Sequence, residues 1–396
     1  MSRHPRHIAP LLLVALLLTT LITGCQRKPL YLAQHGNISI AAAEYDLRLE
    51  MLWGADWRVH WQYPWDEAKY GPVGYTQPTG VHAIAYQLGD DLQRARWHYD
   101  RHISSTGGRI QLATLNHYDI LLYNDDTEWI HFTDREEHRS NNSDFATFNL
   151  TTRTNSRAKY TRSQLGYNEP DQLFGTLMED LYISDDPDDY VIERNEDGSI
   201  SYVCKMEAEL QPYTYIYLYQ VILKNNRTDK GNAIVTNYTG VTANGLAAGV
   251  DLFTGQTHTT PVSLTQDHVV PIVPEHPVTL PDGTDTVADI LGARIQTWGL
   301  PGIVPMRALT RGEEIQVKDS TYLGIGLHLH NGITYIMQSN VTEQMQQHPT
   351  GGVITILLDV TKEIPDSIIN KPAEGGGAFD AVVKDWDNEV HTEIEI

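Results

Sequence analysis

Apolar and polar residues alternate with a period of two along the chain, and this feature constrains the fold most. From residue 45 to residue 53 the odd-numbered side chains are apolar or aromatic, and the even-numbered ones from 46 to 50 are charged. Tyrosine occupies every second position from Tyr213 to Tyr219. Successive side chains of a strand point to opposite faces, so this pattern is typical of strands with one buried face. We therefore expect an all-β protein.

Further strands are expected at residues 81–88, 110–115, 118–123 and 353–360. Two segments suggest helices instead. Phe174, Leu177 and Leu181 are spaced as on one helix face, which predicts a helix within residues 171–183. Residues 288–298 are the second helix candidate.

The acidic run at residues 185–189 interrupts the strand pattern and indicates a domain boundary. The spacing of strands and turns on either side fits two β-sandwiches. The expected organisation is a signal peptide at 1–24, a tether at 25–42, an N-terminal sandwich at 43–186, a C-terminal sandwich at 187–372, and a glycine hinge with a terminal strand at 373–396.

The N-terminus predicts lipid anchoring. Basic residues precede an aliphatic run from Leu11 to Ile22, which is too short to span a membrane and is typical of a secretory signal. Gly24 and Cys25 follow it directly, as in the bacterial lipobox, where the cysteine thiol is acylated and becomes the new N-terminus. Two or three acyl chains anchor a protein stably. With Gln26 next to the lipidated Cys25, we expect an outer-membrane lipoprotein, exposed on the cell surface in one interpretation.

Charge and cysteine content exclude several classes of function. The 51 acidic residues outnumber the 29 basic ones, which argues against a nucleic-acid partner because a phosphate backbone needs a basic surface. Beyond Cys25 the chain has only Cys204, so no intrachain disulfide is possible. No phosphate-loop lysine, nucleophile elbow, His-Glu-x-x-His or dinucleotide fingerprint occurs. We expect no enzyme activity and no cofactor.

Half of the eight tryptophans lie within 13 residues: Trp53, Trp57, Trp61 and Trp65. One interpretation is a stacking platform for sugar rings, which would make the chain a glycan-binding surface lipoprotein. The alternatives are packing within the first sandwich, since aromatic residues dominate core burial, and contact with a partner protein.

The spacing of His328 and His330 would place two imidazoles on one face of a strand, as some zinc sites do. Nothing in the sequence selects a third ligand, and a solvated polar face explains the pair equally well. These two residues are the only metal candidates that we single out.

Four segments carry a resemblance to a known family: Cys25–Tyr31, His117–Asp126, Gly240–Val250 and Gly377–Asp387. Together they resemble Bacteroidota lipoproteins of unknown function related to FimB-type minor or anchor subunits of fimbrillin (type V) pili. The resemblance implies two transthyretin-like, Greek-key β-sandwiches in tandem and a role in adhesion or pilus assembly without catalysis.

The resemblance also implies that other pilus subunits are partners, joined by β-strand augmentation, in which an added strand satisfies a neighbour's sheet edge. The segment expected to do this is the terminal strand, with Val390, Thr392, Ile394 and Ile396 on one face. The alternative is that it forms an edge strand of its own domain.

Overall fold

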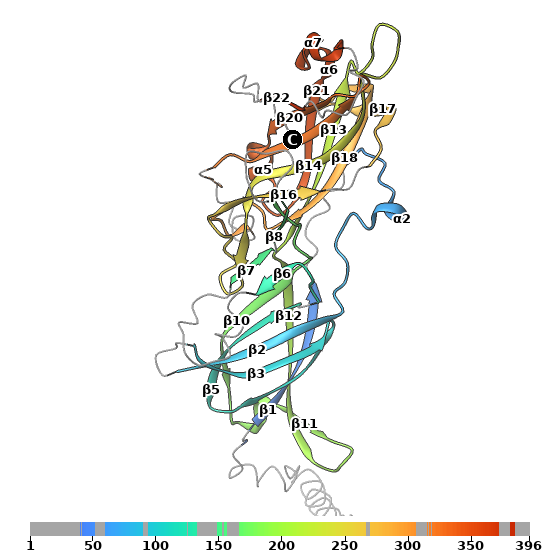
Figure 1. Ribbon diagram of the computed structural model, residues 1–396. Coiled ribbons are helices and arrows are strands. Elements are labelled where there is room, and N and C mark those ends of the chain that lie inside the picture. Colours follow the sequence, from blue (N-terminus) through green and yellow to red (C-terminus); the bar gives the residue numbers. More distant parts are fainter. Residues whose placement is uncertain are drawn as a thin grey trace, which may run out of the picture.

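The protein is described by a computed structural model covering residues 40, 42–51, 60–89, 94–124, 126–132, 149–152, 154–156, 166–266, 270–305, 315, 317, 319–371 and 381–384. Strands dominate these residues, and the helices are single short turns. The all-β class predicted from the alternation is therefore confirmed. Figure 1 shows two lobes arranged end to end.

The first lobe is an eight-stranded sheet in the order β1-β4-β3-β2-β5-β10-β12-β11. Its strands are β1 (Ala42–Met51), β2 (Gly80–Leu88), β3 (Arg94–Ser104), β4 (Gly107–Ala113), β5 (Asn116–Tyr123), β10 (Phe174–Ile183), β11 (Val191–Arg194) and β12 (Ile200–Pro212), with the 3-10 turn η3 (Pro187–Asp189) before β11. A parallel pairing of β12 with β1 closes the sheet on itself. The sheet continues past residue 186, where the sequence suggested a boundary, and ends at Pro212.

Strand β1 shows why the alternation is informative. Tyr45, Leu47 and Leu49 are buried in the core of the first lobe, whereas Arg48 and Glu50 are exposed. Burial of each large apolar side chain contributes about 1.5–3 kcal/mol. A shift of the pairing by one residue would expose all three, so the pattern also fixes the register.

The second lobe is a sandwich of a four-stranded sheet, in the order β17-β18-β13-β21, and a seven-stranded sheet, in the order β22-β20-β19-β14-β16-β9-β8. Their strands are β8 (Thr154–Ser156), β9 (Gly166–Tyr167), β13 (Tyr215–Lys224), β14 (Val235–Ala247), β16 (Pro261–Gln266), β17 (Val273–Thr279), β18 (Asp285–Thr297), β19 (Tyr322–Leu329), β20 (Thr334–Asn340), β21 (Gly352–Asp359) and β22 (Ala381–Lys384). The short helices α5 (Thr342–Gln347), α6 (Val360–Glu363) and α7 (Asp366–Ile369) flank β21 in sequence.

Segments from the first half of the chain pair with strands of the second half. A three-stranded sheet combines β6 (Ile130–Phe132) and β7 (Asn149–Thr152) with β15 (Gly249–Asp251). In addition, β9 pairs in parallel with β16. The two lobes are therefore joined by backbone hydrogen bonds, in the region between them in Figure 1.

A further segment of the first half, which we call the strap (residues 60–76), lies on the outer face of the four-stranded sheet and includes α2 (Glu67–Tyr70). The side chains of β13 that face away from the sandwich core, Ile216 and Leu218, pack beneath Val73 of the strap and are fully buried. Gln220, on the same face, accepts a hydrogen bond from the Gln62 N–H (2.9 Å). Strand β13 is consequently buried on both faces.

Both predicted helices are strands. Residues 171–183 contain β10, in which Asp180 has a φ of 52° and the pairing with β5 shifts between Met178 and Leu181. Leu177 packs in a different cluster from Phe174 and Leu181, so both faces of this strand carry apolar side chains. Together with the bulge, this makes apolar residues recur at helix-like intervals. Residues 288–298 fall largely in β18, which has apolar residues on both faces because the strap covers one and the core the other. A strand buried on both faces lacks a period-two pattern.

Candidate functional site

The two edge strands of the four-stranded sheet, β17 and β21, differ in how their outward backbone groups are satisfied. An edge strand presents a row of unpaired N–H and C=O groups that can pair with another chain. Proteins that are not meant to pair through an edge protect it with proline, a bulge or a covering segment.

The β17 edge carries all three protections. Pro277 has no N–H to offer, and Glu275, with a φ of 50°, lies in a bulge between Val273 and His276. The strap closes the end of the strand: the side-chain amide of Gln62 donates to the Thr279 carbonyl (2.9 Å) and accepts from the Thr279 N–H (2.6 Å). This edge is closed to further strands.

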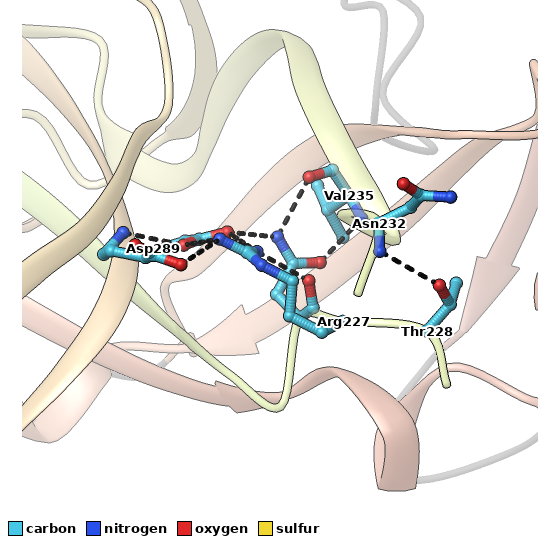
Figure 2. A network of polar contacts seen from close by, with 7 residues as sticks. Arg227, Thr228, Asn232, Val235 and Asp289 are labelled. Carbon is cyan, nitrogen blue, oxygen red and sulfur yellow. Dashed lines mark hydrogen bonds and ion pairs between the residues drawn. The ribbon is translucent and has the colours of Figure 1, made fainter. Parts of the chain in front are cut away.

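A buried polar network around Asp289 and Arg227 (Figure 2) holds the bulge in place. Asp289 of β18 is 4% exposed and accepts hydrogen bonds from the Arg227 guanidinium, the Asn226 amide (2.7 Å) and the Glu275 N–H (3.0 Å). Burial raises the pKa of Asp289, but the bonds from Arg227, Glu275 and Asn226 outweigh it and the pKa is lowered. The Asn226 amide also bonds both backbone groups of Val235, which ties the start of β14 to the network.

By contrast, the described residues cover the β21 edge at two places. The Gln344 side-chain amide of α5 accepts from the Thr355 N–H (2.9 Å) and donates to the Thr355 carbonyl (3.2 Å). At the end of the strand the Asp359 N–H donates to Glu363 Oε1 (3.0 Å). All three hydrogen bonds are made by side chains, which a backbone strand can replace.

Between these contacts the β21 edge is open. Alternate residues of a strand direct their N–H and C=O to the same edge, so Val353 and Leu357 present theirs on the same side as Thr355. Neither backbone has a hydrogen-bond partner on that side among the described residues. The strand contains no proline, and the Leu357 side chain is 39% exposed. Among the described residues, two backbone positions of the β21 edge are therefore unpaired.

Sequence reasoning missed this edge. The alternation in β21 predicts a strand but does not show which of its edges is unpaired, because strand order is set by contacts distant in sequence. Gln344 has no local signal either, since its role depends on where α5 lies relative to β21.

The described tryptophans of the predicted aromatic cluster belong to the strap. Trp61 and Trp65 are half-buried and pack against the core of the second lobe, and the Trp65 indole N–H donates to the Gly71 carbonyl (2.9 Å). Tyr63, between them, is buried over Gly292 of β18. Trp53 and Trp57 lie outside the described residues.

Cys25 and the terminal-strand residues Val390, Thr392, Ile394 and Ile396 also lie outside the described residues. The last described strand before that segment, β22, pairs in parallel with β20 at the edge of the seven-stranded sheet. Among the helices that the structure describes, none is both long and apolar enough to cross a membrane.

The two histidines of the metal hypothesis do not share a strand face. His328 is the penultimate residue of β19, whereas His330 lies in the following turn, where its N–H donates to the Ile234 carbonyl (2.8 Å). Within the described part of the chain, no three His, Cys, Asp or Glu side chains are grouped as metal ligands. Cys204, in β12, is partly buried, and burial followed by the charge of Asp189 raises the pKa of its thiol.

Comparison with known proteins gives one family match. Residues 65–241 match a family described as a domain of unknown function, DUF5119. This region includes the strap from Trp65 onward, most of the first lobe and the first strands of the sandwich. No curated protein matches the sequence.

Several solved structures are similar over most of the chain. A candidate adhesin from Bacteroides ovatus is 16% identical, with a TM-score of 0.44 over 85% of this chain and 97% of that one. A candidate adhesin from Bacteroides thetaiotaomicron is 10% identical, with a TM-score of 0.42 over 82% and 93%. The fimbrial anchor protein Mfa2 from Porphyromonas gingivalis is 10% identical, with a TM-score of 0.39 over 80% and 91%.

Proposed function

We propose that the protein is a lipid-anchored, non-catalytic subunit of a pilus, in a minor or anchor position, and that its β21 edge receives a strand from another subunit. The observation that carries this proposal is the asymmetry of the four-stranded sheet, which is closed at β17 and open at β21. The lipobox at Cys25 supports attachment to the outer membrane, and the tandem transthyretin-like sandwiches implied by the sequence resemblance are part of the same proposal.

Strand addition here is an exchange of partners. An incoming strand would bond Val353 and Leu357 and would displace the Gln344 amide from Thr355, so two existing bonds are replaced by equivalent ones. In the free protein Gln344 covers the middle of the edge and limits unwanted pairing. The terminal segment Glu389–Ile396 is the strand that we propose this chain donates in turn.

The β21 edge is tested by removing one outward N–H. Leu357→Pro deletes the N–H that faces away from β13, so the sheet keeps its own hydrogen bonds while strand addition is blocked. Leu357→Ala is the matched control, because it removes the side chain and keeps the N–H. After mild crosslinking on intact cells and purification of this protein, we expect fimbrillin-like subunits with the wild type and Leu357→Ala, but not with Leu357→Pro.

Two results would count against the proposal. Recovery of outer-membrane transporter components, or of no protein partner, from wild-type cells would contradict the pilus role. Equal recovery of pilus subunits with Leu357→Pro would leave the pilus role intact and exclude the β21 edge.

The anchor is tested separately. Cys25→Ala removes the acylated thiol, and we expect the protein to move from the membrane to the soluble fraction on cell fractionation. Unchanged membrane retention would show that the lipobox assignment is wrong. Deletion of Glu389–Ile396 tests donation by the terminal strand, since normal pilus assembly without it excludes that role.

A further inference from the structure

A polar cavity of about 570 Å³ lies at the junction of the two lobes. The first half of the chain contributes the end of the strap, the residues after β5 and the connection at residues 168–172. The second lobe contributes β16 and β18. The volume falls in the usual range of small-molecule sites, roughly 300–1,000 Å³.

Two acceptors that line this cavity have few hydrogen-bond donors among the described residues. Among the described residues the Glu169 carboxylate, whose side chain is 24% exposed, accepts only from the Gln296 N–H at 3.3 Å, and the Arg294 guanidinium is 3.9 Å away, beyond hydrogen-bond distance. Gln266 is 6% exposed, and its amide donates to the Arg294 carbonyl (2.5 Å), which fixes the amide orientation. Its Oε1 then has no partner among the described residues. Buried acceptors without donors are rare in folded proteins, so the Gln266 Oε1 indicates a missing donor. The partly exposed Glu169 carboxylate is open to hydrogen bonds from the same donor-bearing ligand.

An exposed tryptophan is fixed at the rim of this cavity. Trp129 is 39% exposed, although its backbone is held firmly: Asp171 Oδ2 accepts from the N–H groups of both Glu128 (2.6 Å) and Trp129 (2.5 Å). The indole therefore offers an apolar surface in a position set by the backbone. The apolar face of a sugar ring, formed by its C–H bonds, is complementary to such a surface.

The charges around the cavity exclude an anionic ligand. Asp126 and Asp171 line it, together with Glu169, whose pKa is raised to about 7 by burial, and Arg294 is the one cation among its lining residues. The guanidinium is already engaged, since its Nε donates to the Val73 carbonyl (3.0 Å) and its Nη2 to Gln296 Oε1 (2.8 Å). The lining suits a neutral ligand with several hydroxyl donors.

We propose that this cavity binds the end of a neutral saccharide chain, with Trp129 stacked on a sugar ring and with Glu169 and Gln266 accepting hydrogen bonds from hydroxyl groups. The site is distinct from the tryptophan cluster at residues 53–65. The proposal for this cavity does not depend on a role in a pilus, because none of the residues that line the cavity belongs to the β21 edge.

The test uses the full mature chain and a panel of maltotriose, mannotriose, N-acetyllactosamine, sialyllactose and spermidine in calorimetric titrations. We expect at least one neutral oligosaccharide to bind. Trp129→Ala should raise its Kd about tenfold, the equivalent of about 1.4 kcal/mol, while Trp129→Phe keeps most of the affinity. The control is Tyr182→Ala, which removes an exposed aromatic ring in β10 outside the cavity and should leave the Kd unchanged.

Three outcomes would overturn the proposal. The first is that the panel's neutral oligosaccharides fail to bind, and the second is that only sialyllactose or spermidine binds. The third is that Trp57→Ala abolishes saccharide binding while Trp129→Ala leaves it unchanged, which places the site at the tryptophan cluster. Circular dichroism of each variant separates loss of binding from loss of fold.

Discussion

Glu169 titrates near neutrality because its surroundings disfavour its charged form. Burial raises the pKa of this carboxyl to about 7, against the opposing effects of Arg294 and the Gln296 N–H. The folded protein therefore holds a proton at Glu169 between about pH 4.5 and 7, where the unfolded chain has released it. By linkage, the stabilisation from this protonation is complete below that window and is lost as the pH rises through it.

The corresponding variant is Glu169→Gln, which cannot ionise. Between pH 5 and 8 the free energy of unfolding of the wild type should fall by about 2–3 kcal/mol more than that of Glu169→Gln, since each pKa unit corresponds to about 1.4 kcal/mol. Denaturant unfolding at the two pH values measures this difference. Parallel pH profiles for the two proteins would show that Glu169 is ionised in the folded state throughout.

Asp126 lines the same cavity, but its pKa moves the other way. Burial raises the pKa, and hydrogen bonds from the Thr79 N–H and hydroxyl and from the Asn124 amide more than compensate, so that the pKa is lowered. Asp126 is therefore charged throughout the range from pH 5 to 8, and it does not contribute to the pH dependence of the free energy of unfolding there. The pKa values of the two carboxyl groups move in opposite directions because Asp126 accepts hydrogen bonds from Thr79 and Asn124, whereas Glu169 accepts one long bond from the Gln296 N–H.

At the scale of elements, alternation in the sequence predicts a strand well where one face of the strand is exposed to solvent. Strand β1 is the clear case, whereas β2 and β5 are predicted correctly although nearly all of their side chains are buried. The prediction fails for β10, where the bulge at Asp180 reverses the alternation, and for β18, where the strap buries the second face. Neither cause is local, because a bulge depends on the partner strand and burial of a face depends on what covers it.

The candidate sites were less predictable than the strands. The β21 edge and the cavity at Glu169 and Trp129 both arise from segments far apart in the sequence, and neither has a spacing motif. The tryptophan density at residues 53–65 was visible in the sequence, but the partner of Trp61 and Trp65 was not. They pack on the second lobe, more than 140 residues along the chain.

Helix α5 gives a prediction about the edge that it covers. Gln344→Ala removes both hydrogen bonds to Thr355 and should lower the free energy of unfolding by about 1–2 kcal/mol. Because Thr355 then joins Val353 and Leu357 as an unpaired position, the purified variant should also self-associate more strongly than the wild type. Denaturant unfolding and sedimentation velocity measure the two effects.

The matched control is Gln347→Ala, which removes an exposed glutamine from the same helix and should change neither quantity. If Gln344→Ala is as monomeric and as stable as this control, the Gln344 amide does not protect the β21 edge.

At the scale of the whole molecule, the strap couples the two lobes. It leaves the first lobe after β1, crosses the outer face of the four-stranded sheet and returns to the first lobe at β2. On the way, the Tyr63 hydroxyl donates to the Pro271 carbonyl (2.7 Å) and the Tyr75 hydroxyl to the Thr214 carbonyl (2.8 Å). Together with the β9–β16 and β7–β15 pairings, these contacts lead us to expect that the lobes unfold in a single transition.

Gly292 is the position at which this coupling can be broken with one methyl group. A Cβ there would lie 2.6 Å from Tyr63 Cγ and 2.9 Å from Trp61 Cη2, much closer than van der Waals contact allows. Gly292→Ala should therefore displace the strap, at a cost of about 1–3 kcal/mol. We expect calorimetry to resolve two transitions and limited proteolysis to cut within residues 60–76, neither of which the wild type should show.

Gly74→Ala is the control for this variant, because it adds the same methyl group to the strap itself at a point where no atom lies within 4 Å. It should unfold like the wild type. A single transition in Gly292→Ala at the wild-type temperature would mean that the strap can shift without releasing the sheet. In that case the pairing of β9 with β16 and of β7 with β15 would be sufficient to hold the lobes together.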